Sequence, residues 1–188
     1  MLKLKFAFTS LVLCCLFISV SAQAETGCSI VYGPDWAFLF KTPDKWESAC
    51  PVNNQSGMVI TLWPEGFQWA QAPGIIYATV SDKDNFTLEQ FAEDELARFR
   101  TESPELQVKA VESLTLQDKR VALVKELSGD QYGNHEIIAY ADAGNAYLIF
   151  VLSSKTQEEY ERLKLSFKEL VRSVSPMKIK FEGAKKSP

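Results

Sequence analysis

The chain has 188 residues, of which 46% are hydrophobic and 23% are charged, a composition typical of one globular domain. Its formal net charge is −4 at pH 7, and lysine and arginine form no dense run outside the two termini. Because nucleic-acid binding needs a concentrated basic surface, an acidic chain of this kind is a poor candidate for it.

The N-terminus has the three parts of a secretory signal peptide. A short basic start with Lys3 and Lys5 precedes an apolar stretch at residues 6–20, and small residues follow at Ala22 and Ala24. The apolar stretch is shorter than the ~18–20 residues that span a bilayer, which argues against the alternative of an uncleaved anchor. We expect cleavage after Ala24 and no transmembrane segment afterwards, so that the protein is periplasmic or secreted.

Two cysteines remain after that cleavage, Cys28 and Cys50, since Cys14 and Cys15 leave with the signal. In an oxidising compartment such a pair indicates a disulfide. Closing this loop would stabilise the fold by about 3 kcal/mol through the entropy of the unfolded chain. A metal or redox pair would need closer spacing and more than one histidine, so the disulfide is the favoured interpretation.

The mature chain begins with an expected hairpin. Residues 29–32 and 36–40 are strand candidates around a Gly-Pro-Asp turn, and Trp36, Phe38 and Phe40 share one face that should pack inward. Pro43 ends the second strand, because proline cannot donate to a sheet ladder. Trp46 follows, and we interpret it as a core or edge anchor.

The next two strands, at residues 58–63 and 75–81, enclose an unusual loop at residues 64–74. This loop contains Phe67 and Trp69 together with two prolines and two glycines. Its rings must either tuck into the core or stay exposed, and exposed rings would form a contact patch. The sequence leaves both possibilities open.

A helix begins after Thr87, which with Gln90 forms a capping box. Apolar residues from Leu88 to Phe99 follow one helical stripe, and Pro104 ends the helix. The charged residues on its other side are typical of a solvated face.

Four strands should follow, at residues 108–116, 120–127, 135–142 and 146–152. Their short connections predict an antiparallel meander. The turns near Asp118 and Gly144 would then lie at one end of the sheet, with the loop at residues 128–134, which contains Tyr132, at the other. The last strand is apolar on both faces, so we expect it to be covered on both sides.

The last helix begins after Thr156, and Ser175 and Pro176 end it. Residues 25–176 therefore form one domain, followed by a lysine-rich flexible tail at residues 177–188. The predicted fold class is α+β, with an antiparallel sheet of about seven strands and helices on both faces, a three-layer α/β/α sandwich.

This pattern resembles the PsbP-like superfamily, whose members include the extrinsic PsbP subunit of photosystem II, Ran-binding nuclear relatives and bacterial envelope proteins. The stretch from Phe38 through Pro43 to Trp46 is similar to the family's aromatic strand with its proline and tryptophan. The helix start from Thr87 to Phe91, the four-strand meander and the last helix agree in order. The resemblance spans residues 36–174 and implies an adaptor, chaperone or accessory subunit. It brings no catalytic residues.

Catalytic chemistry finds little support in the residues themselves. The single histidine, His135, stands at the start of a predicted strand, where neither Ser128 nor Ser153 has a nucleophile-elbow context. As a metal ligand it would lack a partner, because Glu136 points to the opposite face of the strand. We therefore expect no catalytic, cofactor-binding or metal-binding residues and no cofactor.

The sequence favours a non-enzymatic extracytoplasmic binding or accessory protein that docks a protein or peptide and not nucleic acid. Phe67, Trp69 and Tyr132 are the candidate contact residues, with Trp69 at the centre because a large amphipathic ring anchors interfaces well. Two alternatives are a structural envelope component held by its lysine-rich tail and a small hydrolase that uses His135.

Overall fold

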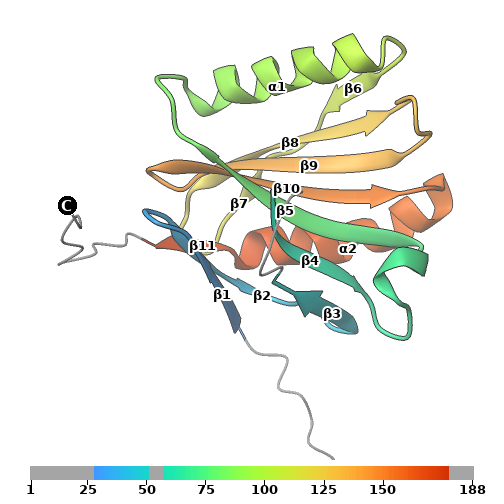
Figure 1. The fold of residues 1–188 in the computed structure, drawn as a ribbon, viewed down its shortest axis with the longest axis horizontal. Helices are drawn as coiled ribbons and strands as arrows, with labels where there is room; N and C mark the ends of the chain where they lie inside the picture. Colours follow the sequence, from blue (N-terminus) through green and yellow to red (C-terminus); the bar gives the residue numbers. More distant parts are fainter. Residues whose placement is uncertain (1–27, 51–56, 178–188) are drawn as a thin grey trace, which may run out of the picture.

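The structure is a computed structural model that describes residues 28–50 and 57–177 (Figure 1). The predicted signal peptide and residues 178–188 of the predicted tail lie outside these residues. The strands are β1 (Cys28–Tyr32), β2 (Ala37–Lys41), β3 (Trp46–Ala49), β4 (Met58–Pro64), β5 (Gly74–Asp82), β6 (Gln107–Ala110), β7 (Leu114–Thr115), β8 (Val121–Ser128), β9 (His135–Asp142), β10 (Ala146–Ser154) and β11 (Ser175–Met177). The helices are α1 (Leu88–Glu102), α2 (Gln157–Ser173) and a short 3-10 turn, η1 (Trp69–Gln71).

The main sheet is antiparallel, has eight strands and follows the order β3-β4-β5-β10-β9-β8-β6, with β7 also paired to β8. The expected meander from β8 to β10 is present. The expected single sheet of about seven strands is not confirmed, because the N-terminal hairpin lies outside this sheet and two further strands join it. Trp46 begins a strand that pairs with the end of β4, and the stretch at residues 108–116 divides into β6 and β7, which both pair with β8.

The N-terminal hairpin forms a second, three-stranded sheet in the order β1-β2-β11. Ser175 pairs with Leu39 and Met177 with Ala37, so the chain returns after α2 to flank β2. Met177, which was assigned to the tail from the sequence, belongs to strand β11. Pro176 is tolerated there because β11 is an edge strand.

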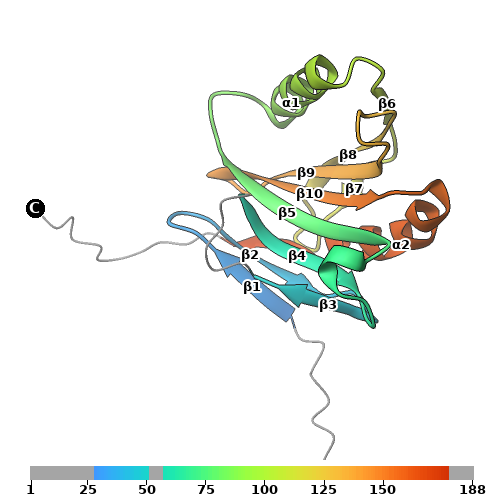
Figure 2. The ribbon, with the colours of Figure 1, turned by 45° about the vertical axis from the view of Figure 1, so that its right-hand side comes forward.

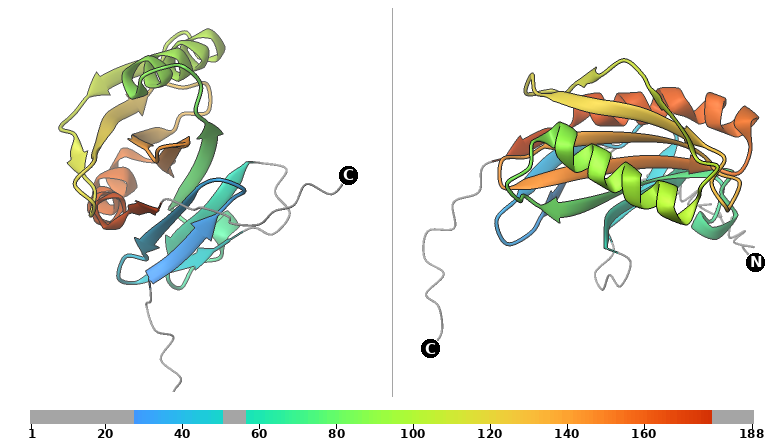
Figure 3. Two further views of the ribbon diagram at one scale, coloured as in Figure 1. Left: turned by 90° about the vertical axis from the view of Figure 1, so that its left-hand side faces the viewer. Right: turned by 90° about the horizontal axis from the view of Figure 1, so that it is seen from above.

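Strand β10 lies at the centre of the main sheet, and its alternate residues face two separate hydrophobic clusters. Leu148, Phe150 and Leu152 pack in a cluster with Leu163, Phe167 and Leu170 of α2 and with Phe38 and Phe40 of the hairpin. Ile149 and Val151 pack in a cluster with Ala92 and Leu96 of α1. Figures 2 and 3 show the small sheet and α2 on one side of the main sheet and α1 on the other.

The two helices begin where the sequence predicts. Thr87 and Gln90 form both bonds of the capping box at the start of α1, and the Thr156 side chain accepts a hydrogen bond from the Glu159 backbone N–H at the start of α2. At the far end of α1, the Ser103 N–H bonds the Phe99 carbonyl oxygen. Among the described residues, neither helix is long and apolar enough to cross a membrane.

Candidate binding site

Four connections meet at one end of the main sheet, which we call the loop end. Ser154 pairs with both Gly74 and His135, and His135 pairs in turn with Ser128. Gln107 pairs with Ser128 and completes the row. These paired residues form one row across the sheet, at the ends of their strands. Four connections lie beyond this row: the loops β4–β5, α1–β6, β8–β9 and β10–α2. The sequence predicted the position of the β8–β9 loop but could not place the β4–β5 loop beside it.

All three predicted contact residues lie at the loop end, and their rings are exposed. The exposed fraction is 45% for Phe67, 45% for Trp69 and 69% for Tyr132. The β4–β5 loop is held to the end of β10 by the Ser154 hydroxyl, which donates to the Pro73 carbonyl oxygen at 2.8 Å. Of the two possibilities left open for the loop, the structure shows exposed rings.

The β8–β9 loop is built around the Asp130 carboxylate. It accepts hydrogen bonds from the backbone N–H groups of Tyr132, at 3.2 Å, and Asn134, at 2.7 Å, and from the Asn134 side-chain amide at 3.1 Å. The Gln131 N–H donates to the Ser103 hydroxyl at 3.2 Å, which ties the loop to the end of α1. The loop therefore holds Tyr132 on a braced backbone.

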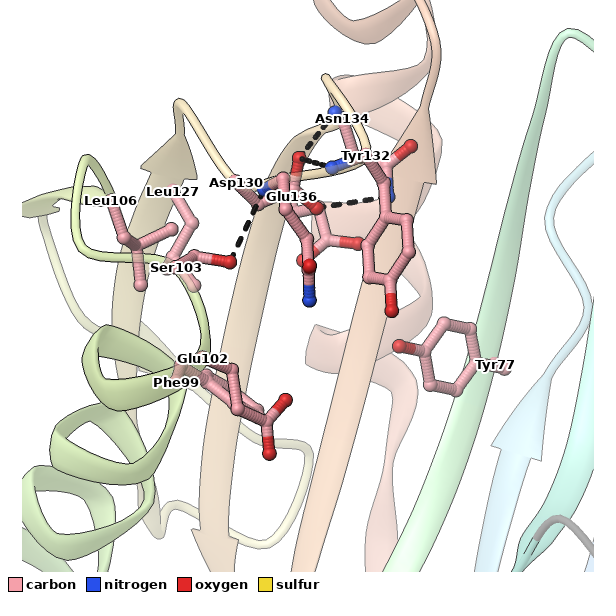
Figure 4. A pocket seen from close by; sticks show the side chains of 11 residues that line it. Tyr77, Phe99, Glu102, Ser103, Leu106, Leu127, Asp130, Tyr132, Asn134 and Glu136 are labelled. Carbon is pink, nitrogen blue, oxygen red and sulfur yellow. Dashed lines mark hydrogen bonds between the residues drawn. The ribbon is translucent and has the colours of Figure 1, made fainter.

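A pocket of about 270 Å³ lies between this loop, the C-terminal end of α1 and the sheet. Figure 4 shows the side chains of Tyr77 and Glu102 pointing into the space from opposite sides, with Tyr132 and Glu136 between them. The lining residues come from β5, α1, the α1–β6 connection, β8, the β8–β9 loop and β9: Tyr77, Phe99, Glu102, Ser103, Leu106, Leu127, Asp130, Gln131, Tyr132, Asn134 and Glu136.

Burial changes the ionisation of the groups that line this pocket. It raises the pKa of Glu136 above its ordinary value, and the Asp130 charge adds to this effect, whereas Ser153 and Lys155 oppose it. Burial also raises the pKa of Tyr77, and the nearby carboxylates of Glu136 and Glu95 raise it further. The pocket is thus acidic and partly shielded from water.

A second pocket, of about 370 Å³, lies next to the first. Trp69, Pro73 and Ile75 give it an apolar wall, and Lys155 stands at its edge. Asn134 lines both pockets and accepts a hydrogen bond from the Lys155 ammonium group at 2.8 Å. Trp69 and Tyr132 therefore line two neighbouring pockets.

His135 lies on the other face of β9 from Glu136, as predicted. Its ring centroid is 6.4 Å from that of Tyr160 on α2, in a shallow hollow of about 240 Å³. No hydrogen bond joins His135 to a serine or threonine hydroxyl within residues 30–50 and 57–177. The described residues also contain no group of three or more histidine, cysteine, aspartate or glutamate side chains able to hold a metal ion.

Each cysteine lies at an edge strand, Cys28 in β1 of the small sheet and Cys50 just after β3 of the main sheet. Cys28 begins β1 opposite Lys41, and the side chain of Cys28 is outside what the structure describes. Cys50 follows β3 and is exposed, and its sulfur has no disulfide partner among the described side chains. The Cys28–Cys50 disulfide stays a prediction.

Comparison with known proteins places the fold. No protein-family model and no curated protein matches the chain. The solution structure of cyanobacterial PsbP (CyanoP) from Synechocystis superposes with a TM-score of 0.52 at 13% identity, over 84% of this chain and 96% of that chain. The fold is PsbP-like.

The PsbP-like fold predicted from the sequence is thereby confirmed. The Ran-binding protein Mog1p of Saccharomyces cerevisiae also superposes, over 80% of this chain and 95% of that chain at 12% identity, with a TM-score of 0.49. At such identities a likeness is one of fold alone, so function must be argued from the site itself.

Tyr77 and Glu136 were not among the site residues predicted from the sequence. Tyr77 stands in an apolar strand and Glu136 directly follows His135, so each fits an ordinary strand pattern. Glu136 itself was a signal, because it directly precedes a run of apolar residues in the same strand. Burying a carboxylate at such a position costs free energy unless the group has a partner or a functional role. Its position beneath α1 depends on pairing that the sequence does not specify.

Proposed function

We propose that this PsbP-like protein is a non-enzymatic binding module that docks a protein or peptide partner at the loop end of its main sheet. The observation that carries the proposal is the placement of two exposed rings, Trp69 and Tyr132, in the linings of two adjoining pockets, with the exposed ring of Phe67 in the same loop as Trp69. Aromatic side chains that flank hollows are the usual anchors of protein interfaces. The braced β8–β9 loop reduces the entropy lost when a partner binds.

The predicted signal peptide supports an extracytoplasmic place for this activity. Export would expose the protein to oxidising conditions, under which Cys28 and Cys50 would form the predicted disulfide. Thiol labelling of the exported, unreduced and unfolded protein should then find no free cysteine, whereas labelling after reduction should find two. One reactive thiol per cysteine before reduction would contradict both the pairing and its stabilising role.

The docking proposal is tested with Trp69→Ala and a matched control at the opposite end of the sheet. Phe86 precedes the N-cap of α1 and is 47% exposed, close to the 45% of Trp69. Removing a central interface ring typically weakens binding by about 2 kcal/mol or more, which is roughly a thirtyfold change in Kd. We expect Trp69→Ala to lose the partner and Phe86→Ala to keep it, with both thermal midpoints close to that of the unchanged protein.

The measurement uses photo-crosslinking from position 71, an exposed glutamine in the same turn as Trp69, in envelope extract to identify the partner, followed by titration of the purified partner against each variant. Equal binding by the two variants would place the partner surface elsewhere. A collapse of stability on Trp69→Ala would show that the ring supports the fold, and Tyr132→Ala, at a more exposed ring, would then test the site.

A further inference from the structure

We propose that the pocket beneath the β8–β9 loop receives an arginine side chain of the partner. This inference rests on the proposed docking function and names the chemistry of one contact within it. The pocket, at about 270 Å³, lies below the ~300–1,000 Å³ range of small-molecule sites, so a single side chain fits it better than a cofactor.

The charges around the pocket favour a cation. Three carboxylates line it, those of Glu102, Asp130 and Glu136, and its lining contains no lysine or arginine. The Asp130 carboxylate is engaged by the backbone of its own loop. Within residues 30–50 and 57–177, Glu102 and Glu136 form no ion pair. The Ser153 side chain is a hydrogen-bond neighbour of Glu136, and a carboxylate still has further acceptor positions for a ligand.

The position of Glu136 adds to this preference. Glu136 lies in strand β9 of the main sheet, where burial raises its pKa and Asp130 adds a like charge nearby. Glu95 on α1 adds a negative charge near Tyr77 and raises the pKa of that residue. A bound cation would neutralise part of this repulsion, whereas an anion would increase it and a neutral group would leave it unchanged.

The aromatic walls distinguish a guanidinium group from a simple ammonium group. Tyr77 and Tyr132 come from different elements and point toward the same space, and Phe99 adds an apolar surface from α1 (Figure 4). A guanidinium group is planar, weakly hydrated and able to stack on rings while its N–H groups meet a carboxylate. A lysine ammonium group is more strongly hydrated and loses more on entering a half-apolar pocket.

The position of the pocket also fits a partner segment that is anchored elsewhere. Asn134 lines both this pocket and the apolar hollow beside Trp69, whereas Lys155 lines only the hollow, although its charge also reaches Glu136. A peptide that places an apolar residue against Trp69 would therefore carry its arginine away from Lys155 and toward Glu136.

The test is an NMR titration of the purified protein with N-acetyl-arginine amide, compared with the citrulline analogue, which has the same shape without the charge, and with the lysine analogue. We expect saturable shifts of the backbone amides of Tyr77, Tyr132 and Glu136 with arginine, weaker ones with lysine and none with citrulline. Equal responses to arginine and citrulline, or shifts confined to other regions, would overturn the inference.

Substitutions locate the contact. Glu136→Gln keeps the shape of the side chain and should weaken arginine binding at least about tenfold, while Glu112→Gln, at an exposed position outside the pocket, should leave it unchanged. Tyr132→Ala, at a ring that is 69% exposed, should weaken binding without disturbing the fold. If neither pocket variant weakens arginine binding, the pocket is not the site.

The partner identified by crosslinking separates this inference from the docking proposal. If Glu136→Gln keeps full affinity for that partner while Trp69→Ala loses it, docking stands and the arginine contact is wrong. If arginine binds the pocket but both Trp69→Ala and Tyr132→Ala keep the partner, the docking proposal fails and the cation site stands alone.

Discussion

Glu136 brings an ionisable carboxyl group to a strand whose next five residues are buried and apolar. Burial raises its pKa above the ordinary value of 4.5. The folded protein therefore binds this proton more tightly than the unfolded chain does, and ionisation of Glu136 lowers the free energy of unfolding as the pH rises through the raised value.

Glu136→Gln should for this reason be more stable than the unchanged protein at neutral pH. The difference should shrink as the pH falls and vanish below about 4.5, where the carboxyl is protonated in both states. Urea unfolding of both proteins between pH 4 and 8 measures the difference directly and cancels the contribution of other acids such as Glu95. A constant difference across this range would mean that the Glu136 carboxyl is not perturbed by burial.

Such a cost at neutral pH is what a binding residue imposes on a fold. A glutamate that only supported the structure would be replaced by a neutral residue with a gain in stability and no loss. If Glu136 is a binding residue, Glu136→Gln should therefore gain stability and at the same time lose affinity for arginine.

Among the connecting elements, the β8–β9 loop contains two glycines in the left-handed region, Gly129 with φ of 77° and Gly133 with φ of 70°. They differ in their surroundings. A Cβ atom at Gly129 would lie 2.8 Å from the Glu105 backbone oxygen, whereas one at Gly133 would meet no heavy atom within 4 Å. Gly129 is thus where the β8–β9 loop closes against the α1–β6 connection.

Gly133→Ala should cost about 1 kcal/mol, the price of a left-handed alanine. Gly129→Ala should cost at least about 2 kcal/mol, because a backbone atom must also move. Urea unfolding gives both values. Equal losses would show that the two connections are not packed as closely as the structure indicates.

The elements that local chemistry specifies were predictable from the sequence. Thr87 and Thr156 cap their helices as expected, and the short turns produced the meander. The β3 strand was not predicted, because a four-residue edge segment after Pro43 is too short to show the alternation of apolar and polar residues that marks a strand. The division between β6 and β7 was not predicted, because both segments contain the residue types that a continuous strand would have.

The candidate site was predictable only in part, because it depends on long-range pairing. Phe67, Trp69 and Tyr132 could be singled out as aromatic residues in polar loops. The β4–β5 loop lies beside the β8–β9 loop only because β5 pairs with β10, a strand about eighty residues further along the chain. No local signal specifies that pairing. The pocket beneath α1 likewise needs three distant segments in place at once.

For the molecule as a whole, Arg120 links the two sheets. Its guanidinium group donates to the carbonyl oxygen of Asp142 at 2.6 Å and to that of Pro176 at 3.1 Å, and its Nε–H donates to the Asp118 carboxylate at 2.6 Å. Asp142 lies at the end of β9 and Pro176 in β11, so one side chain joins the main sheet to the small one.

Arg120→Met should lower the free energy of unfolding by about 2 kcal/mol, because the charged hydrogen bonds to two carbonyl oxygens are lost together. The matched control is Arg98→Met, whose exposed ion pair with Asp94 spans 3.8 Å and should contribute less than about 0.5 kcal/mol. Thermal or urea unfolding measures both. Similar small effects would indicate that β11 holds to β2 without help from the main sheet.

The position of β2 between β1 and β11 also sets an order of events during synthesis. The ribosome makes β2 among the first elements of the domain and β11 last, after α2. Until Ser175–Met177 emerge, one edge of β2 has no partner strand, and an open edge of this kind invites pairing with other chains. The newly made protein is therefore most vulnerable to aggregation before Ser175–Met177 pair with β2, and a chain that stops before Ser175 would keep that edge open permanently.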